Sequence, residues 1–232
     1  MCFRDVADRD YIAARSAHRL GLHEPFLWGA AQAVEKYLKA ILLFHAVPAE
    51  RVGHNVKQAL TLVQRIECLD LRWPEELPVF VHRLHLMGPN RYLENGYSVE
   101  SGDLHRLDAT VWHVRRYCLP VGVGSAASAE SVARRVAAIN RDLFDRHPER
   151  YRIPGGHLEE VIALKREDWK PARTALMWRN AYYSRTRLVQ IRWRSESRNS
   201  PLLLHPEFYP HLKGLVQLPR AYAARSEELG YN

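Results

Sequence analysis

The feature that most constrains this chain is the segment from Phe26 to Leu42, in which apolar residues recur every three or four positions. That spacing puts them on one face of an α-helix, because a helix completes a turn in about 3.6 residues. The apolar positions are Phe26, Ala30, Ala33, Val34, Tyr37, Leu38, Ile41 and Leu42. The opposite face carries Glu35 and Lys39 in the favourable order for an ion pair. The segment therefore predicts a long amphipathic helix.

Four further segments of the first half show the same periodicity. Gly21 suits the end of the first of them and Asn55 suits the N-cap of the third helix in the chain. The additional expected helices are Arg4–Leu20, one from Asn55 to Ile66, one from Pro74 to Gly88, and one from about Val99 to Cys118. No strand is needed in this half, so we predict a bundle of about five helices.

The residues from Gly122 to Ala127 are small and resemble a linker, which places the expected domain boundary between residues 1–120 and 121–232. Beyond it the sequence indicates further helices, a strand with alternating residues and a hairpin partner for that strand. These elements are a helix capped by Ser128 that reaches Leu143, a helix Leu158–Leu164, a helix Asp168–Arg187, a strand Val189–Trp193, a turn Ser195–Ser200 and an apolar partner Leu202–Leu204. The expected fold class is mainly α, a helical bundle followed by a smaller α+β appendage.

The order of features in the first half resembles the HEPN family. The features are Tyr11, Gly21, the block from Ala31 to Ala40 (AQAVEKYLKA), and Gly53-His54-Asn55-Val56. The resemblance covers about half of the chain, and its most specific part is a packing signature. It implies a small helical bundle connected with RNA cleavage or RNA binding, which is active as a homodimer.

Catalytic HEPN proteins carry an Arg, four to six residues and a His, often followed by a Tyr. An Arg can hold a phosphate and a His can move a proton without a metal. The segment of this chain that matches by position contains Arg91, Asn95 and Tyr97, so an Asn stands where the family has its His. Asn is no general base near neutral pH. Catalysis, ligand binding without catalysis, and a structural role for Arg91 all stay open.

A second candidate is Arg106 and His113, which share one face of the expected last helix, together with Tyr117. This face lies opposite the apolar stripe, and we expect it to be exposed to solvent or to lie in an interface. A solvated face without a function is the competing interpretation.

The positive charge of the chain lies in its second half. Residues 1–120 hold 15 Lys and Arg against 14 Asp and Glu, whereas residues 121–232 hold 19 against 12. From Lys165 to Arg198 there are ten basic and three acidic residues, interleaved with aromatic ones. Basic residues can follow phosphates while aromatic rings stack on bases, as in proteins that bind single-stranded RNA. The candidate nucleic-acid-binding residues are Trp178, Arg179, Tyr182, Arg185, Arg192 and Arg194. The alternative is a small module with an aromatic core that the arginines only solvate.

Other classes of site find little support in the sequence. No apolar run is long enough to span a bilayer, and no secretory signal is visible, so we expect a cytoplasmic protein. His and Cys residues do not stand at metal-ligand spacing, and no cofactor is expected. The predicted function is RNA binding with possible metal-independent cleavage in a defence or toxin system. The alternative is a non-catalytic dimeric module that docks a partner, such as a nucleotidyltransferase or an antitoxin.

Overall fold

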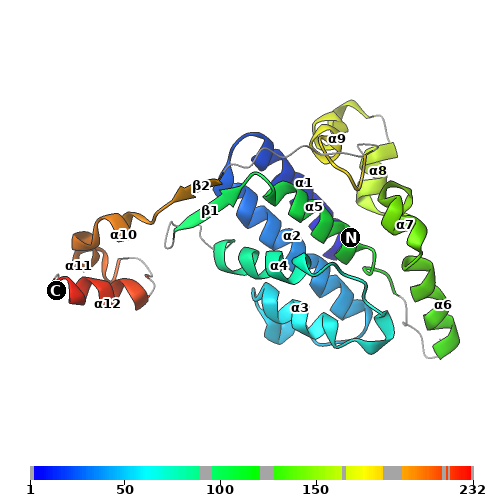
Figure 1. Cartoon of the computed structure of the whole chain (residues 1–232), viewed down its shortest axis with the longest axis horizontal. Coiled ribbons are helices and arrows are strands. Elements are labelled where there is room, and N and C mark those ends of the chain that lie inside the picture. The colour runs from blue at the N-terminus through cyan, green and yellow to red at the C-terminus, as the bar shows by residue number, and fades with distance from the viewer. Residues whose placement is uncertain are drawn as a thin grey trace.

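The computed structural model describes residues 3–88, 96–120, 128–163, 166–184, 195–215, 218 and 220–230. Within these residues the first half forms five α-helices and one short strand (Figure 1). Its elements are α1 (Phe3–Arg19), α2 (His23–Phe44), the 3₁₀ turn η1 (Glu50–Val52), α3 (Val56–Gln64), the 3₁₀ turn η2 (Glu67–Leu69), α4 (Glu76–Met87), β1 (Tyr97–Glu100) and α5 (Asp103–Arg115). The predicted fold class, mainly helical, is confirmed.

The helices α1 and α2 form the centre of this bundle. All eight apolar positions of the segment from Phe26 to Leu42 are 0% exposed. Gly21 joins the two helices with a φ of +72°, a conformation that favours glycine. The expectation that Glu35 lies on an outer face was wrong. Its side chain is buried. The carboxylate accepts a hydrogen bond from Nζ of Lys39 at 2.6 Å, and Nδ1 of His54 lies 3.3 Å away.

The last helix of the bundle is shorter than predicted, and a strand precedes it. Val99 lies in β1, and α5 begins only at Asp103, whose side chain accepts a hydrogen bond from the backbone N–H of Glu100 at 2.9 Å. β1 pairs antiparallel with β2 (Ser195–Arg198), in the register Tyr97 opposite Arg198. The expectation of no strand in this half was therefore wrong. Its pairing partner is almost a hundred positions later, beyond the reach of local periodicity.

The segment between residues 128 and 184 packs against the bundle, with α8 and α9 on α1 (Figure 1). Its elements are α6 (Ala129–Ile139), α7 (Asp142–Arg146), the 3₁₀ turn η3 (Pro148–Arg150), α8 (His157–Ala163), the 3₁₀ turn η4 (Glu167–Trp169) and α9 (Lys170–Met177). The cap at Ser128 and the short helix near Leu158 are confirmed. Contacts thus cross residue 120, and the division of the chain at that point stays a prediction.

Two helices of this segment end earlier than predicted. The helix from Ser128 stops at Ile139, because the Asn140 side chain turns to the hydroxyl of Tyr117 and to the carbonyl of Asp70. The helix expected to reach Arg187 stops at Met177. In both cases an Asn side chain near the end of the helix forms a hydrogen bond to a residue far away in the sequence. The spacing of apolar residues cannot predict such a bond.

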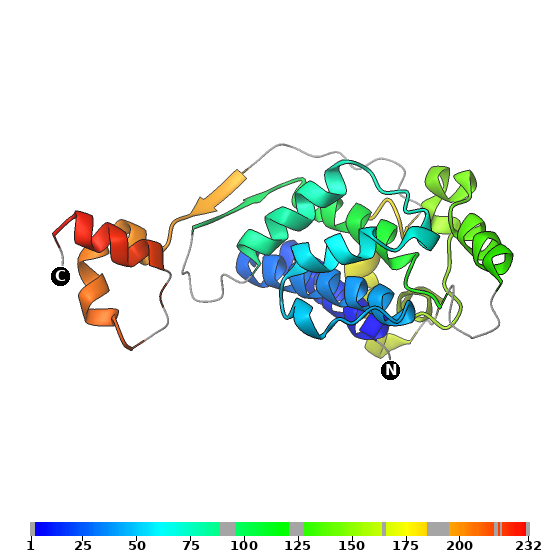
Figure 2. The same ribbon diagram turned by 90° about the horizontal axis from the view of Figure 1, so that it is seen from below.

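The C-terminal elements extend from the β1–β2 pair as a separate lobe (Figure 2). They are α10 (Pro201–Leu204), the 3₁₀ turn η5 (Pro206–Phe208), α11 (Tyr209–Leu212) and α12 (Arg220–Glu228). The predicted hairpin was wrong in its turn and its partner, because residues 195–198 form a strand and Leu202–Leu204 belong to a helix. The predicted strand Val189–Trp193 and the linker Gly122–Ala127 lie outside the described residues. Within the described part, no helix has the length and apolarity that a membrane span requires.

A candidate nucleic-acid interface

Two buried arginines, each paired with an aspartate of the bundle, attach the second half of the chain to it. The guanidinium of Arg15 on α1 pairs with Asp108 on α5 and also donates to the backbone carbonyls of Ala175, at 2.8 Å, and Trp178. Both side chains of the pair are 0% exposed. Because a buried charge is costly unless it is fully hydrogen-bonded, this contact fixes the end of α9 against α1.

The second pair holds α8 and the residues before it. Arg115 donates to both carboxylate oxygens of Asp8 and to Glu159, at distances of 2.7 to 2.8 Å. Glu159 in turn accepts the backbone N–H of Ile153 at 3.0 Å. The chain around residue 153 is thereby tied to the core of the bundle.

The turn after α9 is held by one side chain. Asn180 accepts the backbone N–H groups of Tyr182 and Tyr183, at 3.0 and 3.1 Å, and donates to the hydroxyl of Tyr11 at 2.9 Å. Arg179 directly before it has a φ of +51°, which breaks the helix. The two tyrosines are therefore placed by the core and not by a continuing helix.

Tyr182, one of the predicted nucleic-acid-binding residues, packs against α5, the helix that carries the second predicted catalytic site. Its ring packs 5.7 Å from Trp112 and 5.9 Å from His105, with His113 at 6.5 Å, measured between ring centroids. Burial raises the pKa of Tyr182 to about 12, with a further contribution from Asp108, so the phenol keeps its proton at neutral pH. Burial, together with the positive charge of Arg116, lowers the pKa of His113 to about 4.

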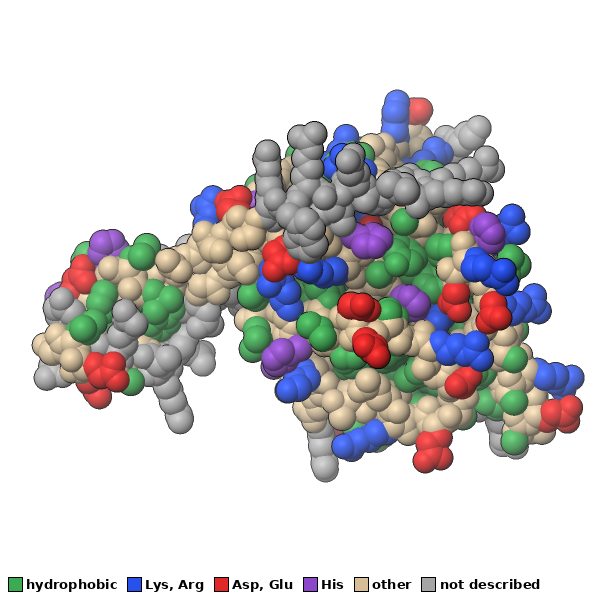
Figure 3. All heavy atoms as spheres, in the orientation of Figure 1, with side chains coloured by type: hydrophobic (Ala, Val, Ile, Leu, Met, Phe, Trp, Pro, Cys, Tyr) green, Lys and Arg blue, Asp and Glu red, His purple; other side chains and the backbone are tan. Residues whose placement is uncertain are grey.

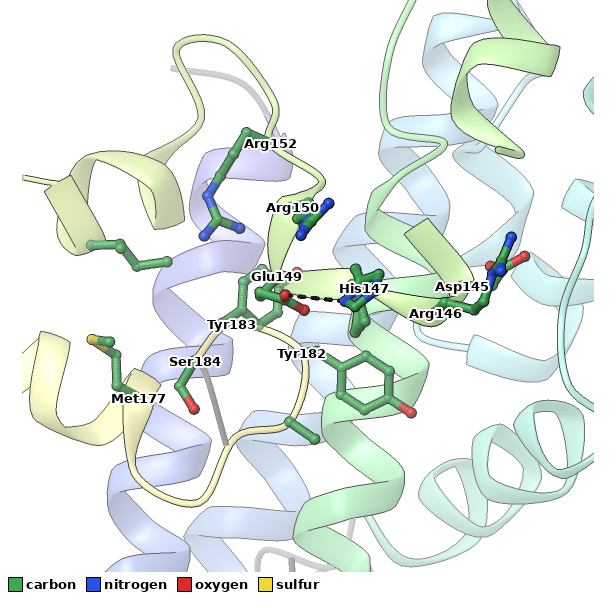
Figure 4. A pocket seen from close by; sticks show the side chains of 13 residues that line it. Asp145, Arg146, His147, Glu149, Arg150, Arg152, Met177, Tyr182, Tyr183 and Ser184 are labelled. Carbon is green, nitrogen blue, oxygen red and sulfur yellow. Dashed lines mark ion pairs between the residues drawn. The ribbon is translucent and has the colours of Figure 1, made fainter. Parts of the chain in front are cut away.

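A cleft of about 1050 Å³ lies between the α7–η3 segment and the turn that follows α9 (Figure 4). We call it the α7–α9 cleft. Its lining residues are Asp145, Arg146, His147, Pro148, Glu149, Arg150, Arg152, Ile162, Met177, Ala181, Tyr182, Tyr183 and Ser184. Figure 4 shows Arg150 and Arg152 on the side of η3, above the pair formed by Glu149 and His147, with Met177 and Ser184 opposite. The lining thus combines cationic, aromatic and hydroxyl groups.

The cleft carries a surplus of positive charge. Within the part of the chain that the structure describes, neither Arg150 nor Arg152 takes part in an ion pair, and both are exposed. Asp145 is neutralised by the buried guanidinium of Arg116 at 2.9 Å, and Glu149 faces His147 at 3.6 Å. On the face of the molecule in Figure 3, basic and acidic side chains are interleaved over the bundle. The lining therefore holds more cationic than anionic side chains.

Of the first predicted site, Arg91 and Asn95 lie outside the described residues. Tyr97 lies in β1, where its buried side chain donates to the carboxylate of Glu24. Burial and this hydrogen bond raise the pKa of Tyr97 well above its usual range. In this structure Tyr97 connects β1 to the start of α2.

The residues of the second predicted site differ in their exposure, and only Tyr117 is buried. Arg106 pairs with Glu100 and Asp103 at the start of α5, at 2.5 and 2.8 Å. Tyr117 is 0% exposed and donates to Asn140 at 2.7 Å. The expected exposure was therefore wrong for Tyr117, which is covered where Asn140 follows α6, whereas Arg106 and His113 are half-buried, His113 with Tyr182 of the turn after α9 beside it. A functional role for Arg106, His113 and Tyr117 stays a prediction.

Three of the six predicted nucleic-acid-binding residues are described. Trp178 lies with the guanidinium groups of Arg179 and Arg19 at 5.4 and 5.9 Å from its ring centroid. Tyr182 lines the cleft. Arg185, Arg192 and Arg194 lie outside the described residues.

The sequence reasoning missed the basic residues of the cleft. Arg146, His147, Arg150 and Arg152 fall within seven residues around a proline, where the sequence was interpreted only as a helix end. This local density of basic residues was a usable signal. Within the described residues, no three His, Cys, Asp or Glu side chains are grouped so that they could hold a metal ion.

Comparisons with known proteins identify the first part of the chain only. Residues 3–100 match the family model described as the HEPN domain. Neither a curated protein nor a solved structure matches the chain.

Proposed function

Because residues 3–100 of this chain are a HEPN domain, which suggests an RNA-related or nuclease-type function, we propose that the protein binds single-stranded RNA in the α7–α9 cleft. The observation that carries the proposal is the cleft itself, whose lining includes the exposed Arg150 and Arg152 and the aromatic side chain of Tyr182. Arginine donates paired hydrogen bonds to phosphate oxygens, and an aromatic ring offers a base a stacking surface. The cleft is large enough for a ligand of nucleotide size, since ligand pockets measure about 300 to 1,000 Å³.

Two features extend this interface. Trp178 and Arg179 stand on the same turn as Tyr182, and the chain continues from Ser184 into the basic segment that contains Arg185, Arg192 and Arg194. In the sequence, Arg179, Arg185, Arg192 and Arg194 add four cations to those of the cleft. A strand of several nucleotides is therefore the ligand that best suits the site.

The test is the affinity for a fluorescently labelled RNA homopolymer, measured by anisotropy over a range of salt concentrations. In the double variant Arg150→Ala/Arg152→Ala we expect weaker binding, because two phosphate contacts are lost. The slope of log K against log salt concentration should shrink by about 1.4, at about 0.7 per contact to a single strand.

The matched control removes two charges elsewhere. Lys57→Ala/Arg65→Ala takes two exposed cations from α3 and its C-cap, outside the cleft, and should leave affinity and slope close to those of the unmodified protein. An equal loss in both double variants would mean that net charge alone governs binding, and the cleft assignment would fall.

A second candidate function is a dimeric module that docks a partner protein without cleaving RNA. Exposed apolar side chains on α2 and α4 favour it, namely Trp28, Val79 and Leu86, at 36%, 70% and 57% exposure. A protein that forms dimers and has no affinity for RNA at low salt would support this candidate over the first.

A further inference from the structure

A second hollow adjoins the α7–α9 cleft, because Arg150 and Arg152 line both. It has a volume of about 550 Å³ and lies between the chain around Pro120, helix α6 and the α7–η3 segment, and we call it the α6–α7 pocket. We propose that this pocket binds the terminal phosphate of an RNA strand whose body lies in the cleft. The inference rests on the proposed function and deepens it, since it gives the site a preference for phosphorylated strand ends.

The charged side chains that line the pocket are all cationic. No Asp or Glu is among the lining residues in the part of the chain that the structure describes. All four cations are arginines with exposed side chains, namely Arg135 in α6, Arg141 between α6 and α7, Arg150 in η3 and Arg152 after it. In the cleft, by contrast, Asp145 and Glu149 stand among the cations. The pocket is therefore the more strongly cationic of the two hollows.

The acids closest to the pocket in the sequence are neutralised elsewhere. Of the two acids of α7, Asp142 lies 3.6 Å from the guanidinium of Arg72, and Asp145 lies 2.9 Å from that of Arg116. Arg141 directly precedes them, yet it takes part in no ion pair with any described residue. The charge of the pocket is thus left for a ligand.

Two of the guanidinium groups are held at the pocket by the backbone. Nη1 of Arg135 donates to the carbonyl of Pro120 at 3.2 Å, and Nη1 of Arg152 donates to the carbonyl of Tyr151 at 3.0 Å. A guanidinium has five N–H donors and can donate two parallel bonds to the oxygens of one phosphate. Because these bonds already restrict both side chains, less conformational entropy is lost when a ligand binds.

An apolar and aromatic wall stands beside the arginines. The rings of Phe144 and Tyr151 meet edge to face, with 5.1 Å between their centroids. The hydroxyl of Tyr151 donates to the carbonyl of Arg116 at 3.0 Å, which fixes the position of its ring. Leu119 and Ile139 complete the wall. A ligand that joins a phosphate to an apolar or aromatic body, as a nucleotide does, matches this lining.

The charge of the ligand distinguishes a strand end from the middle of a strand. Each internal phosphodiester carries one negative charge, whereas a terminal phosphate carries about 1.5 to 2 at pH 7 and has three acceptor oxygens. The end of the strand therefore suits the hollow that holds arginines without acids. The volume of the pocket lies within the range of about 300 to 1,000 Å³ for small ligands, which is sufficient for one terminal nucleotide.

The experiment is a competition assay with the full chain and a labelled RNA homopolymer. The unlabelled competitors have the same sequence and length, and carry a 5′ phosphate, a 3′ phosphate or hydroxyls at both ends. One of the two phosphorylated strands should compete about tenfold better than the hydroxyl-ended strand, the gain that one further hydrogen bond to a charged group provides. The comparison of the two also shows which end of the strand enters the pocket.

The variant Arg135→Gln/Arg141→Gln removes the two arginines that line the pocket but not the cleft. It should reduce the ratio of the two affinities, phosphorylated against hydroxyl-ended, to about one. The matched control is Arg65→Gln/Arg134→Gln, which removes two exposed arginines outside both hollows, one of them the neighbour of Arg135 in α6. It should retain the preference. Because the readout is a ratio, a general loss of charge or of folded protein does not imitate the result.

Equal competition by phosphorylated and hydroxyl-ended strands in the unmodified protein overturns the inference and leaves the proposed function standing. A preference that survives Arg135→Gln/Arg141→Gln removes the pocket from the site. A free mononucleotide that competes as well as the phosphorylated strand makes the pocket a site for free nucleotides, and polyglutamate that does so assigns it to an acidic protein segment. Either result overturns the inference. A protein that binds none of the strands overturns the proposed function as well.

Discussion

At the scale of single residues, His18 and His113 have surroundings that disfavour a positive charge. Burial lowers the pKa of both to about 4, helped by His23 next to the first and by Arg116 next to the second. Their pKa values in the unfolded chain are close to 6.5. Between about pH 6.5 and pH 4 the unfolded chain therefore binds more protons than the folded protein. The free energy of unfolding should fall as the pH falls through this window.

This prediction is checked by urea denaturation at pH 7.5 and pH 5. The midpoint should be lower at pH 5, and the difference should shrink in His113→Gln. The control is His82→Gln, which changes an exposed histidine of α4 and should retain the full difference. Equal midpoints at the two pH values in the unmodified protein would contradict the prediction.

Single residues also show where sequence reasoning succeeded and where it ended. The apolar positions from Phe26 to Leu42 and the cap at Asn55 were predicted correctly, because they follow from local periodicity and local hydrogen bonds. The buried arginines were missed. Arg15 and Arg115 have partners 93 and 107 residues away, Asp108 and Asp8, and no local pattern marks a charge that folding will bury.

At the scale of elements, α4 offers a surface on which a second copy could dock. Val79 and Leu86 are seven residues apart, which puts them on one face of the helix, and both are exposed. If the bundle dimerises through this face, Val79→Asp/Leu86→Asp should convert dimers to monomers. Because both side chains are exposed, each substitution should change stability by no more than about 0.5 kcal/mol.

Size-exclusion chromatography with light scattering measures this outcome. The control is Leu20→Asp/Leu43→Asp, which replaces two exposed leucines, one directly after α1 and one in α2, by acids. A dimer that survives the α4 changes would exclude this face as the interface.

The ends of helices were predicted well where a local residue causes the end, and badly where a distant residue does. Where the stop signal is local, as with Gly21 after α1, the predicted end was correct. Where the break involves a distant partner, as with Asn180 and Tyr11, the helix was predicted too long. The α7–α9 cleft is lined by two segments far apart in the sequence, so the sequence indicated Tyr182 but not Arg150 and Arg152 across the same cleft.

At the scale of the whole molecule, the first half of the chain depends on the second. A chain that ends at Pro120 lacks Glu159 and the carbonyls of Ala175 and Trp178, which bond Arg115 and Arg15. In that chain Arg15 and Arg115 keep their aspartates but lose these further hydrogen bonds, and a hydrogen bond to a charged group contributes about 1.5 to 3 kcal/mol. We expect this shortened chain to be less stable by at least that order, or to remain unfolded.

A chain that ends at Asn199 keeps both buried pairs and the β1–β2 pairing, and it should retain most of the stability of the full chain. Chemical denaturation of the two shortened chains provides the comparison. Equal stability of the chain that ends at Pro120 and the full chain would instead support a domain boundary at residue 120.

The contacts of Arg15 also govern the order of events during synthesis on the ribosome. This residue is made early, yet its hydrogen bonds reach carbonyls 160 and 163 positions later. Domains fold as units while the chain emerges, and contacts over such separations form slowly. Until the turn after α9 has left the exit tunnel, Arg15 can therefore pair with Asp108 but lacks its two carbonyl partners, and the bundle stays partly formed. The nascent chain should be most vulnerable to proteases and most dependent on chaperones during this interval.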